Sequence, residues 1–208
     1  MTDRAPPAAA STPILYYVRH GETDWNAEGR LQGKRDIALN ARGRRQALRC
    51  GEILRELFAR ERRAATEFDY VSSPLVRASA TMELARGVLG LDPASYQTDA
   101  RLAEMSFGLW EGRTYSDLRD AERPALAARE RDKWRFAPPE GESYQQLTAR
   151  VSEWYSTLRC DTVAAAHGGV ARALMAHLRI ENPDAATHRN IEQGVVYVFN
   201  GNRVTRHR

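Results

Sequence analysis

The residues best suited to chemistry lie near position 20. Arg19, His20 and Gly21 come directly after residues 14–18, which are five consecutive apolar or aromatic residues. A guanidinium presents a planar fork of donors that fits a phosphate, and an imidazole can act as a nucleophile or a general base near neutral pH. Gly21 would let the backbone approach a ligand closely. The triplet therefore points to phosphate chemistry, although an ordinary loop with one solvated arginine would contain the same residues.

A second arginine, Arg77, has a similar setting. It comes shortly after the apolar residues 68–71, and Ser73 followed by Pro74 predicts an N-cap and the first residue of a helix. Arg77 would then lie in the first helical turn, where its guanidinium and the helix N-terminus face the same anion. Taken alone, Arg77 could equally be a surface residue, as most arginines of this chain must be.

A second histidine also follows an apolar run. Residues 162–166 predict a short strand, and His167, Gly168 and Gly169 come between this strand and a predicted helix. A lone histidine in this position would more often be structural. Beside a site formed by Arg19 and His20, the pattern instead predicts a second imidazole that faces the phosphate.

Glu104 is the candidate general acid. Leu102, Met105 and Phe107 surround it in sequence, and apolar surroundings favour the protonated form of a carboxyl group. The spacing alone would also suit a solvated glutamate in a loop.

The elements that must position these residues alternate between apolar strands and amphipathic helices. Helical spacing follows Asn40 and Ser143, both of which are plausible N-caps, and residues 195–207 predict a terminal β-hairpin with a type I′ turn at Asn200 and Gly201. In an open α/β sheet, ligands lie beyond the carboxyl ends of the strands. The pattern therefore predicts one domain over residues 14–208, a three-layer α/β/α sandwich with a mainly parallel sheet.

Five strings in the chain resemble, in order, the motifs of the histidine phosphatase superfamily, which includes the cofactor-dependent phosphoglycerate mutases. They are RHGETDWNAEGRLQG (19–33), SPLVRA (73–78), LAEMSFGLWEG (102–112), PPEGES (138–143) and HGGVARAL (167–174). The third string resembles the phosphatase branch. One departure is Ala80, where family members often have glutamine. The resemblance implies a phosphoglycerate mutase-like fold with a lid-like insertion over residues 113–142, in which Trp134, Phe136 and Tyr144 either line the pocket or pack the lid down.

The resemblance also implies a function and a set of roles. The expected activity is hydrolysis of a small phosphorylated metabolite through a phosphohistidine intermediate, without a cofactor or a metal. His20 would be the nucleophile and Glu104 the general acid and base, while Glu111 would be structural. The phosphate would be held by Arg19, Arg77 and His167, and the substrate by Asn26, Thr23, Gln32 and Gly168.

Three alternatives stay open. A phosphoglycerate mutase would return the phosphoryl group to a substrate hydroxyl, but those mutases have a string resembling ERHYG where this chain has EMSFG. A narrower phosphatase, such as one that acts on α-ribazole phosphate, would share the same motifs. A regulatory protein could bind phosphate without turnover, although His20 and Glu104 are both present.

Composition argues against several other classes of protein. The chain has 208 residues and no apolar run of about 20 residues that would span a membrane. Its net charge of +4 could indicate nucleic-acid binding, but Lys34 and Lys133 are its only lysines and acidic residues are interspersed with the arginines. Cys50 and Cys160 lack metal-type spacing and predict reduced thiols in a cytoplasmic protein. Residues 1–13 predict a disordered tail, and the sequence is compatible with a homodimer.

Overall fold

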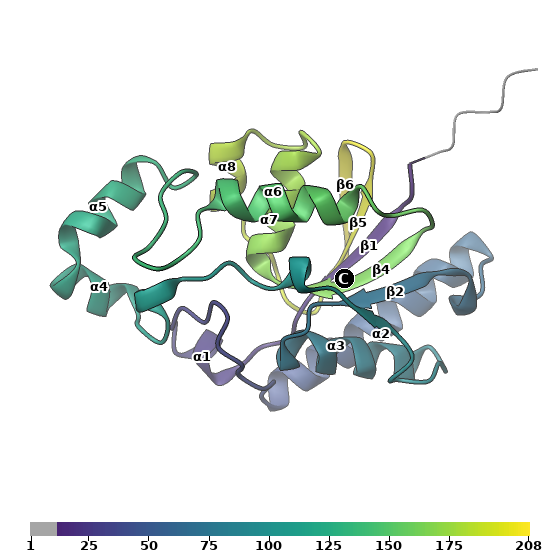
Figure 1. Ribbon diagram of the computed structural model, residues 1–208. Coiled ribbons are helices and arrows are strands. Elements are labelled where there is room, and N and C mark those ends of the chain that lie inside the picture. The colour runs from purple at the N-terminus through teal and green to yellow at the C-terminus, as the bar shows by residue number, and fades with distance from the viewer. Residues whose placement is uncertain (1–11) are drawn as a thin grey trace, which may run out of the picture.

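The computed structural model describes residues 12–208, and these residues form a six-stranded sheet at the centre of the molecule (Figure 1). The strand order is β3-β2-β4-β1-β5-β6. Strands β1, β2, β3 and β4 are parallel, while β5 is antiparallel to β1 and to β6. The strands are β1 Leu15–Arg19, β2 Asp69–Ser72, β3 Gln97–Thr98, β4 Thr162–Ala166, β5 Val196–Asn200 and β6 Arg203–His207.

Helices cover both faces of the sheet because successive strand residues point to opposite sides. Tyr16 and Val18 of β1 pack in the cluster formed with α2 (Ala41–Glu61) and α3 (Val76–Val88). Leu15 and Tyr17 pack on the other face with α6 (Tyr144–Tyr155), α7 (Gly168–His177) and α8 (Pro183–His188). The predicted three-layer α/β/α arrangement with a mainly parallel sheet is confirmed.

Two helix starts agree with the sequence and one does not. Asn40 Oδ1 accepts from Gly43 N at 2.9 Å, and Ser143 forms the predicted capping box with Gln146. Ser73, however, is not an N-cap, because α3 begins at Val76 and its N-cap residue, Leu75, makes no side-chain cap bond. The backbone N–H of Ser73 donates instead to Ala165 O at 2.9 Å, which extends the sheet beyond β2 and delays the helix.

The terminal hairpin also differs from the prediction in its turn. Asn200 pairs with Arg203, so the two turn residues are Gly201 and Asn202. Among the residues with positive φ in the described part of the chain, Gly201 (57°) is present and Asn202 is not. A type I′ turn needs positive φ at both central residues, so that prediction is wrong.

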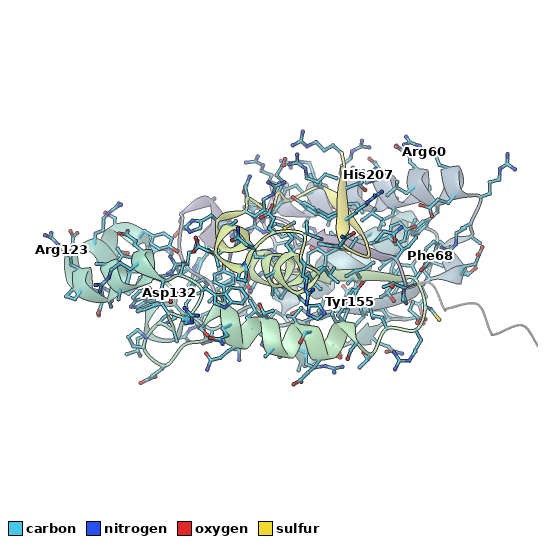
Figure 2. The ribbon with its side chains drawn as sticks, turned by 90° about the horizontal axis from the view of Figure 1, so that it is seen from above. Arg60, Phe68, Arg123, Asp132, Tyr155 and His207 are labelled. Atoms are coloured by element: carbon cyan, nitrogen blue, oxygen red, sulfur yellow. The ribbon has the colours of Figure 1, made fainter. Side chains whose placement is uncertain are left out.

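The segment predicted as a lid-like insertion forms an arm that extends from the sandwich. It contains α4 (Tyr115–Ala121) and α5 (Arg123–Arg131), which lie away from the sheet in Figure 1. Figure 2 shows Arg123 at one end of the molecule and Arg60 near the other. A separate apolar cluster of Leu31, Trp110, Leu118 and Leu126 anchors the arm.

The three aromatic residues proposed for the pocket wall all have packing roles. The ring of Phe136 stacks on Trp110 with the centroids 5.5 Å apart. Tyr144 is buried in the core beneath α7, and Trp134 packs against the same core. These contacts favour the interpretation that the aromatic residues pack the arm onto the body.

The remaining short elements are helix α1 (Asp24–Ala27) and three 3₁₀ helices, Ala65–Glu67, Ala100–Leu102 and Gly108–Trp110. Within residues 12–208, no helix has both the length and the apolar character needed to cross a bilayer. The tail predicted over residues 1–13 lies outside the described residues except for Thr12 and Pro13.

Candidate active site

A cavity of about 130 Å³ brings together residues from several separate segments. Six of the predicted site residues line it: Arg19, His20, Asn26, Gln32, Arg77 and Glu104. Thr23, His167 and Gly168 do not line this cavity. A larger cavity of about 500 Å³ lies elsewhere and contains none of these nine residues. The smaller cavity is the candidate active site because the reactive groups converge on it.

The parallel strands explain how residues distant in sequence meet there. His20 N donates to Ala166 O, and Ser73 N donates to Ala165 O, both at 2.9 Å. The carboxyl ends of β1, β2 and β4 therefore lie next to one another. This arrangement places His20, Ser73 and His167 side by side.

His20 has the form that a nucleophile needs. Its Nδ1 lies 2.7 Å from Gly21 O, and a carbonyl oxygen can only accept, so Nδ1 carries the proton. Burial, followed by the positive charges of Arg19 and Arg77, lowers the pKa of His20 well below its usual value. The neutral ring therefore keeps its lone pair on Nε2. No other atom of residues 12–208 forms a hydrogen bond with Nε2.

Gly21 allows a close approach, but to protein rather than to a ligand. A Cβ atom at Gly21 would lie 2.1 Å from Gly43 O in α2. Any side chain at this position would push α2 away from the end of β1. The glycine thus keeps the His20 backbone in place.

Two arginines supply positive charge to the cavity. Arg77 is fully buried, and its Nη1 and Nη2 donate to Arg35 O and Gly33 O at 2.7 and 2.8 Å. Arg19 Nη1 donates to Ile191 O at 2.6 Å. In both side chains, Nε is buried and has no partner among the described residues. Burial lowers the pKa of both guanidinium groups, so an anion in the cavity would relieve an unfavourable burial of charge.

His167 lies next to His20, with the two ring centroids 5.1 Å apart. Its Nε2 is 2.7 Å from Ser73 Oγ. Ser73 Oγ also accepts from Leu75 N at 3.3 Å. Burial, followed by the charge of Arg77, lowers the pKa of His167 well below its usual value. The ring is therefore neutral near neutral pH, and its Nδ1 is buried without a partner among residues 12–208.

Asn26 presents a donor to the cavity because its oxygen is already occupied. Asn26 Oδ1 accepts from Thr23 N at 3.2 Å and from Gln193 Nε2 at 3.0 Å. A backbone N–H can only donate, which assigns the oxygen and leaves the amide Nδ2 for the cavity. Thr23 is fully buried and its Oγ1 accepts from Asn26 N, so it positions Asn26.

The other two predicted binding residues differ in their placement. Gln32 lines the cavity, and its Oε1 is buried without a partner in the described part of the chain. Gly168 starts α7, and a Cβ there would lie 3.4 Å from Arg172 Nη1 and 3.6 Å from Arg19 Nε. Both are ordinary van der Waals distances, so the two guanidinium groups do not require glycine at position 168.

Glu104 has polar as well as apolar neighbours. Its Oε1 accepts from Met105 N at 3.0 Å and its Oε2 from Gly169 N at 3.1 Å. Leu102 and Met105 are buried beside it, as their apolar character predicts. The two backbone donors hold the carboxylate at the wall of the cavity, in a position to exchange a proton with a bound ligand.

Glu111 links two loops beside the cavity through hydrogen bonds. Its Oε1 accepts from Lys34 N at 3.0 Å and from Phe107 N at 3.2 Å. It thus joins the turn after Glu104 to the loop whose carbonyls hold Arg77. These contacts fit the structural role expected from the sequence.

Two functional contacts were missed by sequence reasoning. Ser73 contacts His167 and is not the predicted N-cap, and no sequence pattern points to Gln193. Gln193 belongs to the segment between α8 and β5, which also supplies the Ile191 carbonyl that holds Arg19. No motif or local spacing marks this segment. In the described residues, no group of three or more His, Cys, Asp or Glu side chains is placed to hold a metal ion.

Comparisons with known proteins find similar sequences and similar folds. A family model described as "Histidine phosphatase superfamily (branch 1)" matches residues 15–205. A protein named probable phosphoglycerate mutase GpmB from Citrobacter koseri is 37% identical in an alignment of 147 residues that covers 66% of this chain. The match spans only 59% of that relative's length.

Two other similar proteins match over nearly their full length. A 2,3-bisphosphoglycerate-dependent phosphoglycerate mutase from Xanthobacter autotrophicus is 30% identical, with 91% of this chain and 92% of that protein covered. The crystal structure of a putative alpha-ribazole-5'-P phosphatase from Escherichia coli has a TM-score of 0.77 and 27% identity, with 94% of each chain covered. The names of these relatives include both mutases and a phosphatase.

Proposed function

The chain belongs to the histidine phosphatase superfamily, and from this premise we propose that it hydrolyses a small phosphomonoester through a phosphohistidine intermediate. The observation that carries the proposal is the protonation state of His20 and the position of its proton. This histidine is neutral, its Nδ1 donates to Gly21 O, and its Nε2 has no hydrogen-bond partner within residues 12–208. It lies in one cavity with Arg19, Arg77 and Glu104.

The first step forms the intermediate. His20 Nε2 attacks phosphorus in line, and the bond between phosphorus and the leaving oxygen breaks as Glu104 protonates that oxygen. The positive charges of Arg19 and Arg77 and the Nδ2 group of Asn26 stabilise charge on the other phosphoryl oxygens. Protein groups supply this positive charge, so we propose that turnover needs no metal.

The second step releases phosphate. Glu104, now ionised, takes a proton from water, and the resulting nucleophile attacks phosphorus. The bond between phosphorus and Nε2 breaks, and His20 returns to its neutral form with the proton still on Nδ1. Inorganic phosphate leaves, and Glu104 is again protonated.

A phosphoglycerate mutase is the second candidate. The names of two relatives favour it. A mutase would pass the phosphoryl group from His20 to a substrate hydroxyl instead of water. The EMSFG string around Glu104 favours hydrolysis. A phosphatase specific for α-ribazole phosphate is the third candidate, after the name of the Escherichia coli structure.

One experiment separates these candidates. The protein is offered a panel of phosphorylated metabolites with a chelator present, including 3-phosphoglycerate with 2,3-bisphosphoglycerate and α-ribazole phosphate. Hydrolysis is expected on at least one monoester and absent in His20→Ala. If phosphoglycerates are interconverted faster than phosphate is released, the protein is a mutase and the proposed hydrolase activity is wrong. Binding without turnover on the whole panel would support a regulatory protein. Activity that returns only when a divalent ion is added would refute metal independence.

A further inference from the structure

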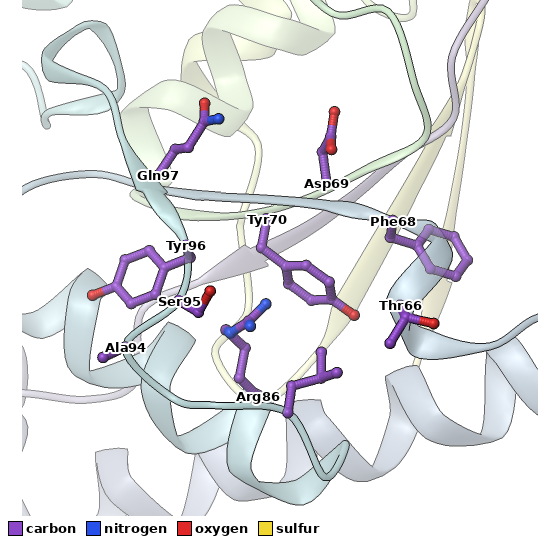
Figure 3. Close-up of a pocket in the computed structure, with 10 residues that line it drawn as sticks. Thr66, Phe68, Asp69, Tyr70, Arg86, Ala94, Ser95, Tyr96 and Gln97 are labelled. Carbon is purple, nitrogen blue, oxygen red and sulfur yellow. The ribbon is translucent and has the colours of Figure 1, made fainter.

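A second cavity, of about 500 Å³, lies at the other end of β2 from the active site (Figure 3). It is bordered by the start of β2, the C-terminal turn of α3 and the loop at residues 91–97. Its volume is within the range of roughly 300 to 1,000 Å³ that small-molecule sites occupy. Arg77 of the active site and Arg86 of this cavity both belong to α3, about 13 Å apart along the helix axis at 1.5 Å per residue.

Arg86 is the central charged group of this cavity. Its side chain is 5% exposed, and its guanidinium carbon lies 4.4 Å from the centroid of the Tyr70 ring. The Nε–H donates to Asp92 O at 2.9 Å, which fixes the plane of the guanidinium. The two Nη atoms have no hydrogen-bond partner among residues 12–208. This geometry leaves the end of the donor fork available to a ligand.

The charge of Arg86 is not compensated by a neighbouring carboxylate. Among the described residues, no carboxylate oxygen lies within 4.0 Å of an Arg86 nitrogen atom. Glu83 accepts from Tyr96 OH at 3.1 Å, and Asp92 Oδ1 accepts from Ala94 N at 3.1 Å. Asp69 and Gln97 point away from Arg86, to the other side of the strands (Figure 3).

An unpaired buried charge is unfavourable, whereas a carboxylate or phosphate matches the guanidinium fork in both charge and shape. The ring of Tyr96 and the hydroxyl of Ser95 lie on the opposite side of the cavity from Tyr70 (Figure 3). They offer an apolar surface and a hydroxyl to the remainder of such a ligand. We propose that this cavity is a separate binding site for a small organic anion, held through its carboxylate or phosphate group by the Nη atoms of Arg86.

Nuclear magnetic resonance on the full chain of 23.4 kDa tests the proposal. Chemical shifts of residues at each cavity distinguish binding at one cavity from binding at the other. Succinate and methylphosphonate, which the active site cannot hydrolyse, are titrated in parallel. Either probe is expected to shift the Arg86 Nε–H signal and the amides of residues 92–97. The probe that binds more tightly identifies the preferred acid group. Succinamide has a similar shape without the charge and is expected to have no effect.

Arg86→Gln is expected to weaken binding about tenfold or more, as measured at the amides of residues 92–97, since it removes a charge-assisted pair. Arg45→Gln is the matched control, because Arg45 is an exposed arginine on α2, and it should leave the titration unchanged. If Arg86→Gln does not fold, the proposal is tested in the wild-type protein instead. Intermolecular Overhauser contacts are then expected between succinate and the rings of Tyr70 and Tyr96. Absence of those contacts, an equal response to succinamide, or shifts confined to residues 19–33 would overturn the proposal.

Discussion

Gln193 Nε2 donates to Asn26 Oδ1 at 3.0 Å, across 167 residues of sequence. This bond joins the segment before β5 to the loop after β1. It directs the Asn26 amide so that Nδ2 faces the cavity that contains His20. The orientation of a predicted phosphate donor therefore depends on a residue that touches neither His20 nor the cavity.

Gln193→Leu is expected to lower kcat/KM about tenfold, because Asn26 loses one of the donors that hold its amide. Gln145→Leu is the matched control, since Gln145 is exposed and should tolerate the same change. The decisive measurement is a double-mutant cycle with Asn26→Ala. In the Asn26→Ala background, the change at Gln193 should have almost no further effect. Independent, additive losses would show that Gln193 does not act through Asn26.

His20 is expected to form the phosphoenzyme, and through Nε2. Rapid quenching with labelled substrate should trap an acid-labile, base-stable species, and phosphorus resonance should assign the phosphoryl group to Nε2 because Nδ1 is engaged with Gly21 O. His20→Ala should not form this species, whereas His188→Ala, a change of an exposed histidine, should. A phosphoryl group on Nδ1 would contradict the tautomer that the structure indicates.

Glu104→Gln is expected to slow phosphoryl transfer from an alkyl phosphate by about 10² to 10⁴. The reason is that a poor leaving group needs its proton in the transition state. Transfer from p-nitrophenyl phosphate should slow much less, because p-nitrophenolate leaves without help. Single-turnover measurements isolate this step from dephosphorylation, in which Glu104 also takes part. Equal losses for the two substrates would mean that Glu104 positions the ligand and does not donate a proton.

Stability is expected to fall as the pH is lowered from about 6.5 to 5.5. The pKa values of His20 and His167 are well below the usual histidine value of about 6.5, so both rings stay neutral in the folded protein over this range. The unfolded chain takes up a proton at each position, which favours unfolding. Each histidine should contribute a slope of up to about 1.4 kcal/mol per pH unit to the free energy of unfolding.

Urea unfolding at several pH values measures this slope. Replacement of His20 by Gln removes one of the two groups and should reduce the slope accordingly. The lower limit of the window avoids the range in which most carboxylates titrate. An unchanged slope in His20→Gln would show that this histidine is not held neutral in the folded state.

Sequence patterns alone were enough to predict the fold class and six residues that line the candidate site. Apolar runs mark β1, β2 and β4, and each run ends next to a residue that could do chemistry. In a parallel sheet, such strand ends share one edge, so local patterns were sufficient to bring His20, Arg77 and His167 together. The motif strings added Glu104 and Asn26, which now lie at the cavity as expected. Local signals were also sufficient for the caps at Asn40 and Ser143, because an N-cap bond joins residues three positions apart.

How these groups are held, and the form that His20 takes, depend on contacts that exist only in the folded chain. Ser73 looked like an N-cap because its sequence neighbours suit one, but its hydroxyl bonds His167, 94 residues away. Gly21 makes room for Gly43 of α2, and Gln193 orients Asn26. Such contacts join segments that the chain brings together only when the sheet is complete. No periodic or local sequence pattern predicts these contacts, because glycine, serine and glutamine are all common residues in loops.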